Sequence, residues 1–218
     1  LEGDEIVMDR NSKIEAKGRT GGGVVLVGGD WQGSGDMRQA TKVTMEAGAT
    51  IDASATDNGD GGKVVLWSDI HNADSVTQVN GSIKAEAGPN GGNGGKVETS
   101  GHSLKLGDAV QVKTGAGQWL LDPYDFTVAV TGGTITGASL GTLLDGNNIT
   151  IIASTTSSAA NTTTTKYGAA GVSGNITIND AVAWSSANVL TLQAAGAISG
   201  NSSGTLTMNS TTTDRKST

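Results

Sequence analysis

The feature that most constrains the fold is an imperfect internal repeat of glycine-led apolar segments between Leu1 and Val130. The segment Gly21–Val27 (GGGVVLV) matches Gly61–Trp67 (GGKVVLW) when Gly21 is aligned with Gly61, and Gly94–Val97 (GGKV) begins in the same way further along the chain. A second element alternates with the first, at Ile14, Ile51 and Ile83, with similar spacings. Two elements that recur in one order are typical of an array of stacked repeats.

Within the second element, apolar and polar residues alternate with a period of two. Ile51, Ala53 and Ala55 alternate with Asp52 and its polar successors, which indicates a half-buried β-strand with one small apolar face. Branched apolar residues alternate with Thr or Asn in four later segments, at 148–151, 175–178, 189–192 and 205–208. The glycine-rich linkers at 57–62 and 88–95 are typical of tight corners, where positive φ angles are needed.

Composition limits how these strands can pack. The chain has 218 residues with 34 Gly, but only 4 Trp, 2 Tyr and 1 Phe. Its core must therefore be filled by Val, Ile, Leu and Ala, which favours a thin, long core over a round one. A β-sandwich has no reason to repeat one strand–corner–strand unit three times, whereas a parallel β-helix stacks such units. We predict an all-β fold, a parallel β-helix with short loops outside the helix.

Charge is distributed unevenly and divides the chain into three parts. Of the 14 basic and 21 acidic residues, only six lie after residue 130. We predict Gly-rich, charged β-helical repeats over residues 1–130, a Thr/Ser/Asn-rich β continuation over 131–210, and a polar tail over 211–218. Inside the second part, the leucines of Ser139–Asp145 indicate one short helical turn.

The overall charge and the apolar runs argue against two classes of partner. The net charge of −7 argues against nucleic acid, because binding phosphates requires a basic face. No run approaches the about 20 apolar residues of a transmembrane helix, so membrane insertion is not expected. Residues 1–9 lack the basic and apolar regions of a signal peptide, and we expect a mature fragment of a longer protein. The absence of Cys excludes a disulfide scaffold.

Two groups of carboxylates are candidates for chemistry, but a structural role is the better interpretation of both. Asp122 and Asp125 flank a Pro-Tyr pair, and a glycosidase needs two carboxylates close to one sugar bond. An Asp-Pro sequence also starts turns in which the carboxylate accepts backbone N–H groups. Asp57 and Asp60 precede glycines, yet they lack the nine-residue period of calcium-binding β-helix repeats.

Other patterns associated with catalysis or cofactors are weak. His71 and His102 are the only histidines, and no Cys or HxxxH spacing accompanies them, which argues against a metal site. None of the glycine segments has the spacing of a phosphate-binding loop. We therefore expect no catalytic, cofactor-binding or metal-binding residues.

Aromatic side chains and glycosylation sequons are the remaining candidate sites. Aromatic rings can stack on sugars, so Trp67, Trp119 and Tyr124 are candidate ligand contacts, although packing is the preferred role for the two tryptophans. If Val64 and Leu66 point inward, Trp67 points outward. Six N-x-[ST] sequons are candidates for glycosylation, although chance matches are expected in a Ser/Thr-rich chain. They begin at Asn80, Asn148, Asn161, Asn175, Asn201 and Asn209.

Three longer segments resemble a known family. Gly59–Asp69 (GDGGKVVLWSD), Gly91–Gly101 (GGNGGKVETSG) and Trp119–Val128 (WLLDPYDFTV), in this order, resemble the large exoproteins of two-partner secretion. This family includes the filamentous haemagglutinin-like and high-molecular-weight adhesins of Gram-negative bacteria. The resemblance implies a right-handed parallel β-helix. It also implies a chain that is translocated through an outer-membrane β-barrel secretion partner and displayed at the bacterial cell surface. It further implies a non-catalytic shaft segment of an adhesin that attaches to a host receptor or to matrix polysaccharide.

Two other functions stay open. One is a carbohydrate-active β-helix enzyme, a polysaccharide lyase or hydrolase, which a groove lined by several carboxylates would favour. The other is the stalk of a toxin-delivery exoprotein, which only sequence beyond Thr218 would distinguish from an adhesin.

Overall fold

The computed structural model describes residues 1–154 and 174–208. Asn161, Asn209 and the polar tail at 211–218 lie outside the described residues. Short strands are the main regular structure, and every ladder between two of the named strands is parallel in the described ranges. The all-β class and the parallel arrangement predicted from the sequence are confirmed.

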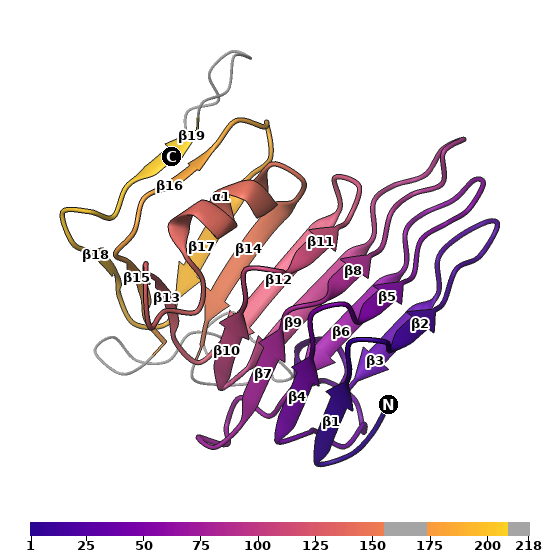
Figure 1. Ribbon diagram of the computed structural model, residues 1–218, viewed down its shortest axis with the longest axis horizontal. Helices are drawn as coiled ribbons and strands as arrows, with labels where there is room; N and C mark the ends of the chain where they lie inside the picture. Colours follow the sequence, from indigo (N-terminus) through magenta and orange to yellow (C-terminus); the bar gives the residue numbers. More distant parts are fainter. Residues whose placement is uncertain (155–173, 209–218) are drawn as a thin grey trace.

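Three sheets contain the first twelve strands, and the chain visits them in a fixed order (Figure 1). Sheet I contains β1 (Glu5–Met8), β4 (Lys42–Met45), β7 (Val76–Val79) and β10 (Ser103–Leu106). Sheet II contains β2 (Lys13–Glu15), β5 (Thr50–Asp52), β8 (Ser82–Lys84) and β11 (Gln111–Lys113). Sheet III contains β3 (Val24–Val27), β6 (Lys63–Trp67), β9 (Lys96–Gly101), β12 (Gln118–Pro123), β14 (Asn148–Ala153) and β17 (Leu190–Ala194). One strand in each sheet makes one repeat unit.

Corresponding residues of successive repeat units pair directly. Ile14 pairs with Ile51, and Ile51 with Ile83, so the spacings seen in the sequence are those of the ladder. The predicted alignment of the second and third glycine-led segments is also confirmed, because Lys63 pairs with Lys96. Identical or similar side chains are therefore stacked in columns, as expected for a repeat array.

The predicted alignment of the first two glycine-led segments is wrong by one residue. Aligning Gly21 with Gly61 would pair Val24 with Val64, whereas the structure pairs Val25 with Val64. A slip of one residue moves a side chain to the opposite face of a sheet, and the observed register keeps Val25 and Val64 together in the main core. Since β6 is apolar on both faces, its sequence fits either register.

The glycine-rich connections between sheets II and III lie one above the other. Those from β2 to β3, β5 to β6 and β8 to β9 extend to the same side of the molecule (Figure 1). The N–H of Gly59 donates to the carbonyl of Gly91, and the N–H of Gly61 donates to that of Asn93, at 2.8 and 2.9 Å. Asp57 and Asp60 accept side-chain or backbone N–H groups of Asn90 and Asn93 in the next connection. The aspartates therefore join stacked corners.

The architecture changes after the fourth repeat unit. Within residues 1–154 and 174–208, sheets I and II end at β10 and β11, whereas sheet III continues. The later strands are β13 (Phe126–Val128), β15 (Ile176–Ile178) and β18 (Ile198–Gly200) in sheet IV, and β16 (Val182–Trp184) and β19 (Leu206–Met208) in sheet V. The helix α1 (Gly137–Leu144) buries Leu140 and Leu144, so the short helical turn predicted from the leucines is present as a two-turn helix.

The side-chain amide of Asn147, which follows α1, links this helix to β11 in sheet II. The buried side chain of Asn147 donates to the carbonyls of Val112 and Leu143, both at 2.9 Å. Its Oδ1 accepts from the N–H and the hydroxyl of Thr114. Asn147 thus satisfies polar groups at the end of β11 where no further strand of sheet II follows among the described residues.

The main core is largely aliphatic, as the composition predicts. Ala residues at the ends of the sheet II strands, such as Ala53 and Ala85, are fully buried. The large aromatic members, Trp119, Phe126 and Trp184, all lie in the fourth repeat unit or beyond it. No helix in the part of the chain that the structure describes is long and apolar enough to cross a membrane.

Candidate functional site

Over β6 and β9, the outer face of sheet III is covered by the loop of residues 28–40, which contains the short 3₁₀ segment η1 (Trp31–Gly33). Trp67 lies beneath this loop with no exposed surface and packs with Val65 and Ile70 in a cluster separate from the main core. Its indole N–H donates to Gln39 Oε1 at 2.9 Å. Trp67 therefore points outward from the sheet, as the alternation predicts, but into a covered site.

The candidate ligand contact at Trp67 is corrected by this packing, and so is the one at Trp119. Both indoles are fully buried. Trp119 belongs to the main core, and its N–H donates to Thr99 Oγ1 at 3.1 Å. Neither ring presents a face to a ligand in this structure, and packing is the role of both.

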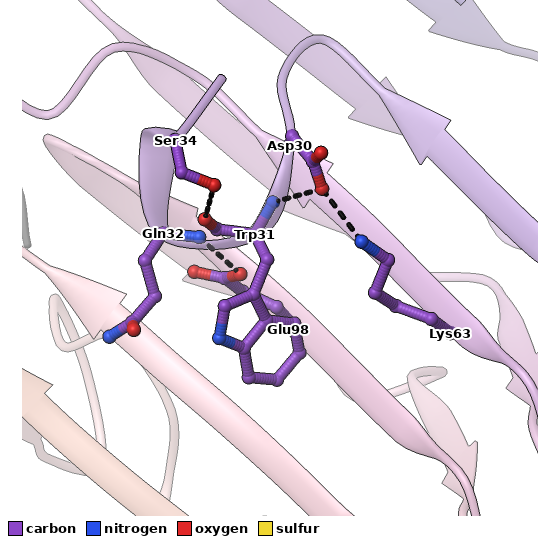
Figure 2. Close-up of polar contacts among 6 residues, drawn as sticks. All are labelled: Asp30, Trp31, Gln32, Ser34, Lys63 and Glu98. Atoms are coloured by element: carbon purple, nitrogen blue, oxygen red, sulfur yellow. Dashed lines mark hydrogen bonds and ion pairs between the residues drawn. The ribbon is translucent and has the colours of Figure 1, made fainter. Parts of the chain in front are cut away.

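The buried carboxyl group of Glu98 holds the covering loop on the sheet (Figure 2). Glu98 Oε2 accepts the backbone N–H of Gln32 at 2.8 Å, and Oε1 accepts the hydroxyl of Ser100 at 2.9 Å. Gln32 has a φ of 54°, in the left-handed region that non-glycine residues adopt at some cost. At the edge of the loop, Asp30 accepts the N–H of Trp31 and pairs with Lys63 Nζ at 2.8 Å.

Burial determines the charge of Glu98. Desolvation raises the pKa of Glu98 to about 8, and the nearby carboxylates of Asp122 and Asp30 raise it further, against the hydrogen bonds from Gln32 and Ser100 that lower it. The pKa of Asp30 is lowered, chiefly by its hydrogen bond to Lys63. At neutral pH the site therefore contains a protonated Glu98 and an ionised Asp30.

We expect the free energy of unfolding to fall as pH rises through the window set by Glu98. Its pKa in the folded chain, about 8, lies above the ordinary value of 4.5, so the folded state binds more protons than the unfolded state between these values. The associated loss approaches about 1.4 kcal/mol per pH unit. Urea unfolding followed by tryptophan fluorescence at pH 6, 7, 8 and 9 measures it.

The variant Glu98→Gln keeps an acceptor for Gln32 and cannot ionise, so its stability should change less with pH. Glu5→Gln, at an exposed position of β1, is the matched control and should keep the slope of the unaltered chain. An unchanged slope in Glu98→Gln would show that another group titrates.

Asp122 and Asp125 do not form a shared carboxylate pair in a groove. Asp122 is almost fully buried, and its Oδ1 accepts the hydroxyl of Ser154 at 3.1 Å. Asp125 is exposed, and its Oδ1 accepts the N–H groups of Gly174 and Asn175 at 2.8 and 2.7 Å. Asp125 therefore binds the backbone of a segment about 50 residues further along the chain, which is not the local turn predicted for Asp122.

Tyr124, the third candidate ligand contact, is half-buried and stacks on His102. The ring centroids are 4.3 Å apart and the planes differ by 19°. The two residues directly follow Gly101 and Pro123, which pair in the β9–β12 ladder. Both rings line a hollow of about 250 Å³ that also contains Lys105, Asp125 and Gly132. Among the described residues, no group of three His, Cys, Asp or Glu could hold a metal ion.

The sequon asparagines within the described residues differ in how their amides are used. Asn148 donates to the carbonyl of Ala116 and accepts from the N–H of Val189, at 3.1 and 3.0 Å. Asn175 accepts from the N–H of Ala197 at 2.9 Å. Asn80 is half-buried, whereas Asn201 is exposed. Glycosylation at Asn148 would break the contact of its amide nitrogen, so Asn201 is the better placed acceptor.

Comparisons with known proteins add no relative to these observations. A scan against protein-family models finds no matching family, and a search of curated proteins finds no match.

Two features of the site were not predicted from the sequence. Glu98 lies in an alternating strand and would be assigned to a solvated face, because the loop that buries it comes two repeat units earlier in the chain. The sequence predicts no structural role for His102. The sequence contains both rings, each directly after a strand. It does not predict the register between β9 and β12, and this register brings His102 and Tyr124 together.

Proposed function

We propose that this chain is a non-catalytic shaft segment of a secreted bacterial surface adhesin, in which the strands wind as a right-handed parallel β-helix. The observation that carries the proposal is the in-register stacking of repeat units across sheets I, II and III. Each added unit lengthens the stack by one strand spacing, about 4.8 Å. Such a design extends a protein along one axis without widening its core.

The right-handed winding is supported by a general property of parallel strands. Connections between parallel strands of one sheet are right-handed in nearly all proteins, because of the twist of the strands. In the first four repeat units, each strand of sheet III is followed by the next strand of sheet III only after the chain passes through sheets I and II. The same winding is expected from the resemblance to two-partner secretion exoproteins.

Secretion through an outer-membrane β-barrel partner, and display at the cell surface, complete the proposal. A chain that stacks unit on unit can fold progressively as it emerges on the far side of a membrane. The sequence contains no Cys, so no disulfide can form and stop the chain while it is still unfolded in an oxidising compartment. The attachment partner is a host receptor or a matrix polysaccharide.

Attachment is tested with the chain itself, coupled to beads and applied under flow. We expect beads that carry the folded chain to be retained on epithelial cell monolayers or on films of dextran or alginate. Beads with albumin, and beads with the heat-unfolded chain, are the controls. Retention no greater than that of the controls on all three surfaces would overturn the attachment role of this segment.

A further inference from the structure

The hollow beside the His102–Tyr124 stack lies where the regular stacking of sheet I stops. Strand β10 is the last strand of sheet I in the part of the chain that the structure describes, and the corresponding strand of the next unit, β13, pairs with β15 in sheet IV instead. A backbone hydrogen bond from the Leu106 N–H to the carbonyl of Thr134 joins β10 to the segment after β13. The resulting gap is the hollow of about 250 Å³.

The stacked rings of His102 and Tyr124 form an aromatic wall of the hollow, and a backbone carbonyl fixes the His102 ring. His102 Nδ1 lies 2.9 Å from the carbonyl oxygen of Ile70. A carbonyl oxygen can only accept, so Nδ1 carries the proton of this hydrogen bond. Tyr124 stacks on this fixed ring. The two half-buried rings thus form a rigid aromatic surface of the kind that packs against apolar groups with little loss of side-chain entropy.

Polar groups of both kinds surround this wall. The ammonium of Lys105 lines the hollow, and it takes part in none of the ion pairs found within the described residues. Asp125 also lines the hollow; it uses Oδ1 for the backbone of residues 174 and 175, and Oδ2 is its second acceptor. Ser103 adds a hydroxyl. One cation and one carboxylate give the hollow donors and acceptors with no net charge.

We propose that this hollow binds one neutral pyranose unit of a glycan. A pyranose presents C–H groups to an aromatic ring and hydroxyls that both donate and accept, which matches the wall and the groups around it. A phosphate or polyanion would meet the Asp125 carboxylate, and an apolar ligand would offer no hydrogen bond to the charged groups of Lys105 and Asp125. Sites for drug-sized ligands begin at about 300 Å³, so a single sugar unit is the fitting size. This inference deepens the proposed function and rests on it.

The two histidines allow a direct test on the intact chain. His71 is exposed and does not line the hollow, so its ring signals are an internal control for those of His102 in an NMR titration. The probes are the methyl glycosides of glucose, galactose and mannose, N-acetylglucosamine, and methyl glucuronide as the acidic comparison. We expect a saturable shift of the His102 signals with a neutral sugar, and no shift of His71.

Variants separate binding in the hollow from binding elsewhere. Tyr124→Ala should weaken binding about tenfold through the lost stack, and Tyr124→Phe should retain it. Lys105→Gln changes an exposed side chain of β10 without disturbing the fold, and should also weaken binding. The proposal is overturned if no neutral sugar shifts His102 saturably, if only the glucuronide does, or if Tyr124→Ala and Lys105→Gln both bind as the unaltered chain does.

The bead assay distinguishes failure of this site from failure of the proposed function. Retention of the beads without a sugar-induced shift at His102 would reject the hollow and leave the adhesin role in place. A saturable shift at His102 without retention would reject the adhesin role and leave the sugar site in place.

Discussion

Gly92→Ala is expected to cost about 3–5 kcal/mol of unfolding free energy, the sum of a strained φ and a collision with the neighbouring corner. Gly92 has a φ of 126°, and a Cβ at this position would lie 2.0 Å from the carbonyl oxygen of Gly59 in the previous connection. That oxygen belongs to the backbone of a stacked corner, so it cannot move without separating the two repeat units. Urea unfolding followed by circular dichroism measures the loss.

The adjacent Gly91 provides a matched control. Its φ is 135°, yet the nearest atom to a Cβ there is a side-chain oxygen of Asn58 at 3.5 Å. Gly91→Ala therefore imposes a similar backbone strain with ordinary contacts, and should cost about 1–3 kcal/mol. Equal losses in the two variants would mean that backbone conformation, and not the close stacking of the corners, makes glycine necessary here.

This comparison explains why the sequence predicts the corners well. A stacked corner leaves no room for side chains, and the requirement for glycine is visible as a repeated residue type at 59–62 and 92–95. The alternation of Val64 and Leu66 with Val65 and Trp67 likewise assigns the two faces of β6, and the structure places the first pair in the main core and the second in the outer cluster.

The sequence does not predict which side chains are buried by segments that lie far away along the chain. Glu98 is buried because Gln32 and the rest of the 28–40 loop lie over it, and no local pattern around Glu98 indicates this loop. The hollow beside Tyr124 has the same origin, since it depends on which sheet β13 joins after β10. Both features follow from tertiary arrangement, whereas a period of two reports only on one strand and its immediate face.

Position 119 tests whether the core has the same width in every repeat unit. The column in sheet III that includes Trp119 contains Val25, Val64 and Val97 in the three preceding units. If the interior were uniform, Trp119→Val would restore the repeat and cost little. Trp119 is fully buried in the main core, however, so the smaller side chain should leave a cavity and cost about 2–4 kcal/mol.

Urea unfolding of Trp119→Val measures this loss, and Trp31→Val is the control, since Trp31 is only partly buried in the outer cluster and should cost less. The loss at 119 has a structural reason: the indole lies in the last unit that has strands in sheets I and II among the described residues, just before β13 joins another sheet and the helix α1 follows. A stable Trp119→Val chain would contradict this account. It would mean that the valine column continues unchanged, and that Trp119 is retained for some purpose other than filling the core.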